Sequence, residues 1–305
     1  MKPHAFELSG QRGWYHDEGH AAGVFHTFDR LDVGREFGPR KVHVLVPRSH
    51  GATDRRYPVL YLHDGDTTFW PGGVAGKSWD VANTLSWLRR EVIVVAIHPV
   101  QRDLEYTHVD WAEGRRPWGR LAAHADYVAD DIAGWIARSY QAIREPRRTA
   151  VVGSSHGGLA AFWTATRRPD VFGLAGCFSP SFFSGLDRLA LPLRVQGSLE
   201  RSELVAGARD VLRDPARRPR IWLCWGGERR GGEHNAVVEA LAERRALEMA
   251  GILRSWGYSH HGSRGADDPS DAELITVGVP NHGHDEGAWR ERFSWMIESF
   301  YPERA

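Results

Sequence analysis

Short apolar segments that alternate with amphipathic helical stretches most constrain how this 305-residue chain can fold. Several of these segments are continuous apolar runs, as expected of strands that are covered on both faces of a sheet. The strand candidates are 42–46, 59–62, 92–97, 149–152, 173–178, 221–225 and 274–279. Strands that alternate with helices form crossover units within a largely parallel sheet. The pattern therefore predicts an α/β fold with helices on both faces of a central sheet.

Helical periodicity occupies the segments between these strands. Apolar residues recur at helical spacing over 122–140, from Val237 to Leu253 and from Trp289 to Phe300. Residues 22–47 lack such a pattern, so we expect an antiparallel lead-in there. No repeat or Pro/Ser-rich linker divides the chain. We therefore expect a single domain over 1–305, with its core at about 22–300.

Charge and composition exclude several classes of function. Lys plus Arg and Asp plus Glu number 39 each, so no net field favours nucleic acid or an anionic membrane. The longest strongly apolar run, 92–97, is far shorter than the ~20 residues of a membrane helix. The N-terminus also lacks the apolar stretch of a secretory signal. We expect a soluble protein that binds neither nucleic acid nor membrane.

The two cysteines, Cys177 and Cys224, form no CxxC motif, and no histidines accompany them at zinc-finger spacing. We therefore expect no metal and no cofactor. Two isolated thiols without a signal sequence favour a cytoplasmic location. The sequence does not exclude a disulfide between these two cysteines, because their predicted strands could be neighbours in the sheet.

The segment 149–162, TAVVGSSHGGLAAF, carries a GxSxG motif between a predicted strand and a predicted helix. This context is typical of a nucleophile elbow, in which a serine lies on a sharp strand-to-helix turn. Gly153 and Gly157 remove side chains that would obstruct the turn, and Gly158 lets the helix approach the sheet. A glycine-rich phosphate turn is the alternative, but the segment lacks the P-loop lysine and the dinucleotide spacing. The sequence predicts that Ser155 is a nucleophile.

A serine hydroxyl needs a general base. In chains that carry a nucleophile elbow, the histidine that acts as this base follows the last strand. The predicted strand 274–279 is followed by Pro-Asn-His-Gly-His-Asp-Glu-Gly, which contains His282 and His284. We favour His284 because it opens the last helix, where a rigid element can hold the imidazole. His282 remains the alternative.

An acidic residue that orients the imidazole should follow the preceding strand, 221–225. Glu228 comes three residues after this strand and Glu233 eight residues after it. We favour Glu228, because a short loop holds a carboxylate more tightly. Glu233 stays open as the alternative.

Two backbone N–H groups should stabilise a developing oxyanion. The first is predicted to be that of His156, directly after the nucleophile. The second is predicted at Asp66, in the turn after strand 59–62. The Asp66 carboxylate would oppose an oxyanion, so it must face away from the anion or bind substrate.

Two polar loops follow predicted strands, at the edge of a sheet where α/β proteins bind ligands. They cover 99–119 and 226–235, and we expect both to border the active site. A loop as long as the first is usually functional or mobile. Its candidate substrate-binding residues are Arg102, Glu105, Tyr106, Trp111 and Trp118.

These motifs together resemble the putative-esterase family of α/β-hydrolases, which includes enterochelin-esterase-like enzymes, feruloyl and acetyl-xylan esterases, S-formylglutathione hydrolases and mycolyltransferases. The matching stretches are YPVLYLHDG at 57–65, RDLEYT at 102–107, VVGSSHGGLAAF at 151–162 and GHDEGAW at 283–289. The elbow is common to all α/β-hydrolases, whereas the LHDG and GHDxxxW elements narrow the resemblance to this family.

The resemblance implies an α/β-hydrolase fold and a serine ester hydrolase without a cofactor. Ser155 would be the nucleophile, His284 the base and Glu228 the acid, with the oxyanion bound by the amides of Asp66 and His156. The substrate would be a small or medium carboxylic ester, cleaved through an acyl-enzyme. An acyltransferase with the same triad is one alternative. A non-catalytic binding module is another, although such modules typically lose the nucleophile or the histidine, and this chain has both.

Overall fold

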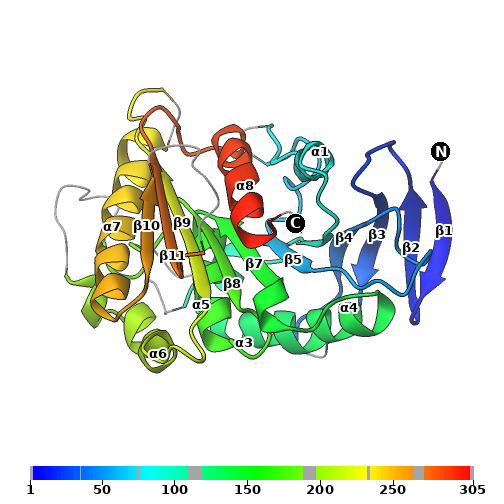
Figure 1. Ribbon diagram of the computed structural model, residues 1–305, viewed down its shortest axis with the longest axis horizontal. Helices are drawn as coiled ribbons and strands as arrows, with labels where there is room; N and C mark the ends of the chain where they lie inside the picture. Colours follow the sequence, from blue (N-terminus) through cyan, green and yellow to red (C-terminus); the bar gives the residue numbers. More distant parts are fainter. Residues whose placement is uncertain are drawn as a thin grey trace.

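A mixed β-sheet runs through the computed structural model, which describes residues 3–34, 36–73, 76–108, 119–187, 197–231, 234–263 and 271–302 (Figure 1). Within these residues the sheet has eleven strands in the order β1-β2-β3-β4-β6-β5-β7-β8-β9-β11-β10. The strands are β1 His4–Leu8, β2 Gln11–His16, β3 Val24–Leu31, β4 Arg40–Val46, β5 Val59–His63, β6 Ile93–Ile97, β7 Thr149–Ser154, β8 Leu174–Phe178, β9 Arg220–Gly226, β10 His260–Ser263 and β11 Leu274–Val279.

Strand direction changes at β6. From β6 to β10 all neighbouring strands are parallel, whereas β1 to β4 pair antiparallel and β4 pairs antiparallel with β6. This confirms the predicted parallel sheet with an antiparallel lead-in, and each predicted strand is present. Sequence reasoning missed β1, β2 and β10, because these strands at or next to the edges of the sheet are short and lack a continuous apolar run.

Helices cover both faces of the sheet (Figure 1). They are α1 Val81–Trp87, α2 Arg102–Tyr106, α3 Leu121–Asp126, α4 Ala133–Ser139, α5 His156–Arg167, α6 Glu203–Leu212, α7 Ala240–Ser255 and α8 Glu286–Phe300. One core lies between the sheet and α3 to α7, and the other between the sheet and α1 with α8. Cys177 of β8 belongs to the first core and Cys224 of β9 to the second, so both thiols are buried and free.

Two helical features differ from expectation. The predicted helix 122–140 consists of α3 and α4 joined by the π-helical turn η1 Tyr127–Ile132. The predicted loop 99–119 contains the short helix α2, whose last two residues are buried. A second π-helical turn, η4 Asn235–Glu239, precedes α7, and single 3-10 turns occur at η2 Pro146–Arg148 and η3 Leu199–Arg201. The described helices include none long and apolar enough to span a bilayer.

Candidate active site

The turn between β7 and α5 holds Ser155 in a strained conformation. Its backbone has φ 54° and ψ −121°, a region that residues with a side chain rarely adopt. A Cβ atom on Gly153 would lie 2.3 Å from the carbonyl oxygen of Gly157, so the turn requires glycine there. The Ser155 N–H donates to the carbonyl of Phe178 (2.9 Å), and its hydroxyl lies 3.2 Å from Oγ of Ser181. These features are those of a nucleophile elbow.

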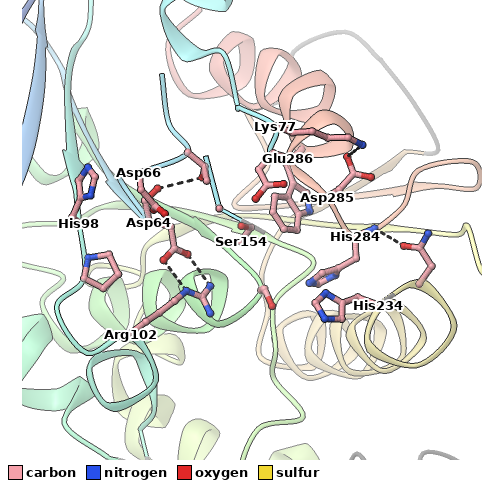
Figure 2. Close-up of a pocket in the computed structure, with 16 residues that line it drawn as sticks. Asp64, Asp66, Lys77, His98, Arg102, Ser154, His234, His284, Asp285 and Glu286 are labelled. Atoms are coloured by element: carbon pink, nitrogen blue, oxygen red, sulfur yellow. Dashed lines mark hydrogen bonds and ion pairs between the residues drawn. The ribbon is translucent and has the colours of Figure 1, made fainter. Parts of the chain in front are cut away.

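Ser155 opens onto a cavity of about 680 Å³ at the carboxyl ends of the parallel strands. Figure 2 shows the polar side chains around it, which come from the loops after β5, β6, β9 and β11. The lining residues are Asp64, Asp66, Thr67, Gly73, Lys77, His98, Pro99, Arg102, Ser154, Ser155, His234, Asn235, His284, Asp285, Glu286 and Trp289. We call this cavity the cleft.

His284 lines the cleft and binds a buried carboxylate behind it. Its Nδ1 lies 2.5 Å from Oε2 of Glu239, and its backbone N–H donates to Oδ1 of Asn235 (2.8 Å). An ionised carboxylate only accepts hydrogen bonds, so Nδ1 carries the proton and Nε2 is left as the basic nitrogen. The imidazole is thus held in the tautomer that a general base requires.

Glu239 is fully buried, and its two oxygens share three donors. Besides His284, these are the N–H of Gly226 and the hydroxyl of Ser179, which lies 2.9 Å from Oε1. Burial by itself would raise the pKa of Glu239. The hydrogen bond and charge of His284, with the charge of Arg292 and the Gly226 N–H, outweigh burial and hold this pKa below its ordinary value. Glu239 therefore stays ionised beside the imidazole.

The expected contact between Glu228 and His284 is absent, and Glu239 takes its place. One Glu228 oxygen accepts the backbone N–H groups of Arg229 (2.8 Å) and Arg230 (2.6 Å), which lowers the pKa of this partly exposed carboxylate. Our prediction that Glu228 orients the histidine is wrong, because the amides of its own loop capture its side chain. The alternative, Glu233, lies outside the described residues.

Sequence reasoning missed Glu239 because it lies in the helical turn η4 and not in the loop directly after β9. One signal was present: Glu239 is the single charged residue in the stretch NAVVEALA at 235–242. A lone carboxylate on the apolar side of a helix must be paired, which suggests a buried partner.

The alternative base, His282, lies elsewhere. Its Nε2 is 3.1 Å from Oε2 of Glu291, and its ring stacks on Trp295 with centroids 6.4 Å apart. His282 is not among the residues that line the cleft. The structure thus brings His284, and not His282, into the same cavity as Ser155.

Of the two residues expected to supply oxyanion donors, Asp66 lines the cleft and His156 directly follows Ser155. His156 is the first residue of α5, where backbone N–H groups point out of the helix and favour negative charge. Burial, with the charge of Arg102, lowers the pKa of its imidazole to about 3, so the side chain adds no charge at neutral pH. In the part of the chain that the structure describes, the Asp66 N–H has no hydrogen-bond partner. The Asp66 side chain is exposed in the cleft.

The expected substrate-binding residues separate into three groups. Arg102 lines the cleft, where Nε and Nη2 bind the two oxygens of Asp64 at 2.7 and 2.8 Å (Figure 2). Glu105 and Tyr106 do not reach the cleft, so both predictions are wrong. Trp111 and Trp118 lie outside the described residues.

Glu105 and Tyr106 are structural because α2 turns them into the core. Glu105 forms a buried ion pair with Arg40, with 2.8 Å between Oε2 and Nη1. The Tyr106 hydroxyl accepts the backbone N–H of Asp64 (3.1 Å) and so supports the turn that carries Asp66. Burial, with the nearby Asp64 charge, raises the pKa of this phenol.

Other cleft residues had not been predicted. His234 packs edge-on against His284, with ring centroids 5.9 Å apart. Lys77 pairs with Asp285, the residue that caps α8, at 2.9 Å (Figure 2). The Glu286 carboxylate faces the cleft beside this pair. Burial raises the pKa of Glu286, and the charges of Asp285 and Asp64 add to this effect.

Residues 37–298, which contain every described element of this site, match the family described as putative esterase. The chain belongs to the putative esterase family. This confirms the family resemblance of the sequence motifs, and the match extends over most of the chain.

Curated relatives of this family member are distant. Iron(III) salmochelin esterase of Escherichia coli O6:H1 is 25% identical over 284 residues, which cover 88% of this chain and 56% of the relative. Uncharacterized protein YbbA of Bacillus subtilis is 23% identical over 154 residues, which cover 48% of this chain and 58% of the relative. The chain spans a little over half the length of both curated relatives.

Solved structures of similar shape confirm the α/β-hydrolase fold. Siderophore hydrolase EstA from Aspergillus nidulans has a TM-score of 0.62 at 17% identity, covering 93% of this chain and 97% of that one. An IroE-like serine hydrolase from Shewanella oneidensis has a TM-score of 0.61 at 15% identity, covering 89% and 78%. At such low identity these likenesses establish the fold alone.

Proposed function

We propose that this esterase-family protein is a serine carboxylic-ester hydrolase that works through Ser155, His284 and Glu239. The observation that carries the proposal is the hydrogen bond between Glu239 and His284, a histidine that lines the same cleft as the strained Ser155. A nucleophile, a base in the correct tautomer and a buried carboxylate form the set that acyl transfer requires.

The reaction begins when the Ser155 hydroxyl attacks the ester carbonyl carbon and gives its proton to Nε2 of His284. The carbonyl oxygen becomes an oxyanion, which the N–H groups of His156 and Asp66 stabilise. His284 then protonates the leaving alkoxide, and the acyl group stays on Ser155. A water molecule, deprotonated by His284, releases the acid and restores the serine.

Glu239 acts through the imidazole in both steps. Its carboxylate holds the Nδ1 proton and stabilises the imidazolium that forms when His284 accepts the serine proton. Because Glu239 is buried and ionised, its charge is only weakly screened by solvent at the histidine.

The cleft volume supports a small or medium ester as substrate. A cavity of about 680 Å³ falls within the range of roughly 300–1,000 Å³ that is typical of sites for small molecules. The names of the relatives add siderophore esters to the substrates worth testing, because one relative is a salmochelin esterase and another a siderophore hydrolase.

Mass spectrometry after incubation with a fluorophosphonate tests the proposal without knowledge of the substrate. The expected result is a single adduct on the peptide that contains Ser155, with no adduct in Ser155→Ala. A panel of aryl esters should be hydrolysed by the wild type and not by this variant. Folded wild-type protein that neither reacts nor hydrolyses any of these esters would overturn the proposal.

A second assay separates hydrolysis from acyl transfer. Alcohol is added to the reaction, and the ratio of free acid to new ester measures how the acyl group is divided between water and alcohol.

A further inference from the structure

Arg292 of α8 is one of the largest fully buried side chains in the described structure, and it lies directly behind the catalytic pair. Its Nη1 donates to Oγ of Ser179 (3.3 Å) and lies 3.8 Å from Sγ of Cys224. Its Nη2 donates to the carbonyl of Gly283 (3.3 Å), the residue before His284. Its Nε donates to the carbonyl of Ala288 one turn earlier (3.1 Å).

A buried guanidinium is costly unless a negative charge lies close to it. No described carboxylate forms a direct ion pair with Arg292. A single hydroxyl connects it to Glu239: Ser179 accepts from Nη1 of Arg292 and donates to Oε1 of Glu239. Trp289 donates to the same Ser179 oxygen (3.4 Å), so the two acceptor positions and one donor of this hydroxyl are all used.

The arrangement links Arg292 to both members of the pair at once. Through Ser179 its charge faces the Glu239 carboxylate, and it is one of the charges that lower the pKa of that group. Through Gly283 it holds the backbone from which His284 projects. Because the Arg292 guanidinium is planar and buried, its N–H groups make these contacts from one fixed position.

We propose that Arg292 is a positioning residue for the Glu239–His284 pair, which it holds by charge through Ser179 and by geometry through Gly283. This inference rests on the proposed function, because it assumes that the pair acts as base and orienting acid. Arg292 does not touch the cleft, so its effect on catalysis is transmitted by the pair alone.

The two contributions predict different results for two substitutions. Arg292→Met removes both the positive charge and the planar guanidinium. The Glu239–His284 pair then binds a proton more readily, so the enzyme loses activity at a higher pH than the wild type does. The acid limb of the kcat/KM profile should move up by about one pH unit, and kcat should fall about 10- to 100-fold. Arg292→Lys keeps the positive charge but lacks the planar guanidinium, so kcat should fall while the acid limb stays near its wild-type pH.

Arg290 provides the matched control. It lies on the exposed side of the same helix, where its guanidinium is 4.0 Å from Asp80. Arg290→Met makes the same chemical change without reaching the pair, and both kcat and the acid limb should stay at wild-type values. The other described titratable groups near Arg292 and the pair are Cys224, His156, His234, His282, Asp285 and Glu291, and all of them are retained in these variants.

The experiment measures kcat and kcat/KM from pH 5 to pH 9 with an uncharged aryl ester, together with a thermal melt of each variant. A folded Arg292→Met enzyme with the wild-type acid limb and kcat would overturn the inference. If Arg292→Met does not fold, Ser179→Ala tests the charge link instead, since it removes the hydroxyl between Arg292 and Glu239. It should lower kcat and move the acid limb in the same direction, and a wild-type profile would overturn the inference.

Fluorophosphonate labelling of the wild type separates this inference from the proposed function. If wild-type Ser155 is not labelled, the proposed function fails before Arg292 is tested. If it is labelled and the variants behave like the wild type, only the role of Arg292 fails.

Discussion

Oε2 of Glu239 lies 2.5 Å from Nδ1 of His284, across 45 residues of sequence. The carboxylate reaches the histidine from the π-helical turn before α7, and the histidine comes from the loop between β11 and α8. Glu239 is the last residue of this turn and its side chain is buried, where Gly226 and Ser179 complete its hydrogen bonds. The carboxylate that contacts His284 thus comes from a helical turn and not from the loop directly after β9.

Glu239→Gln should lower kcat/KM by about 10²–10⁴-fold, because an amide can donate to Nδ1 and so select the wrong imidazole tautomer. Glu228→Gln is the matched control and should stay within about two-fold of wild type, as its carboxylate binds only its own loop. Ester hydrolysis by both variants at pH 8 makes the comparison. A larger loss from Glu228→Gln would restore it as the acid.

Ser155→Gly should be more stable than Ser155→Ala by about 1 kcal/mol, although both lack the nucleophile. At φ 54° and ψ −121° the alanine keeps the backbone strain of the serine, whereas glycine relieves it. Urea unfolding of the two variants measures the difference. Equal stabilities would show that the elbow stores no strain.

Glu105→Gln should lower the free energy of unfolding by about 3 kcal/mol or more, because it leaves the buried Arg40 guanidinium without a countercharge. Its KM for aryl esters should stay at the wild-type value, since Glu105 does not line the cleft. Denaturant unfolding and steady-state kinetics are measured on the same preparation. A raised KM at unchanged stability would return Glu105 to the substrate-binding residues.

The protein should lose stability as the pH falls below about 6.5. Burial lowers the pKa of His43 to about 3 and that of His63 to about 4, whereas the unfolded chain binds these protons near pH 6.5. Between these values the unfolded state holds more protons, so each histidine lowers the free energy of unfolding by about 1.4 kcal/mol per pH unit.

Urea unfolding between pH 7.5 and pH 5 measures this slope. His63→Leu should make the slope shallower, because it removes a group that binds a proton in the unfolded chain but not in the folded one. Neither ring nitrogen of His63 has a described hydrogen-bond partner, so leucine removes no hydrogen bond. An unchanged slope in this variant would mean that His63 is protonated in the folded protein.

The cleft should favour cationic over anionic esters. No described Lys or Arg forms an ion pair with Asp66 or Glu286, whereas Asp64 and Asp285 are paired with Arg102 and Lys77. Among matched aryl esters, kcat/KM should be about ten-fold higher for an aminobutyrate than for a glutarate monoester. The ratio should fall in Glu286→Gln but not in Asp210→Asn, an exposed acid on α6 away from the cleft. A preference for the anionic ester would contradict this charge balance.

The parallel sheet and the elbow could be predicted from the sequence because both are encoded locally. Continuous apolar runs identify the buried strands wherever they lie in the chain. The glycines around Ser155 identify a turn that only a residue without a side chain permits at those positions. The histidine loop could be found in the same way, since it directly follows the last predicted strand.

Contacts between side chains that lie far apart in the sequence could not be predicted in this way. Glu228 was favoured because it lies three residues after the predicted strand, but the structure leaves it in its own loop and places the more distant Glu239 against His284. Arg292 reaches Ser179 across 113 residues, and although its spacing from Trp289 and Met296 places it on the apolar face of the helix, the sequence does not indicate its partner. Glu105 likewise belongs to a polar stretch but turns into the core.

The sequence alone thus determined the buried strands of the parallel sheet, the helical layers, the turn that carries Ser155 and the loop that carries His284, because spacing and glycine act over a few residues. Only the tertiary structure decided which charges meet. A charged side chain enters the core only where a partner from another element compensates the loss of solvation. That compensation depends on the packing of α7 and α8 against the sheet, and it places Glu239 against His284 and Arg292 against Gly283, whereas Glu228 stays in its own loop.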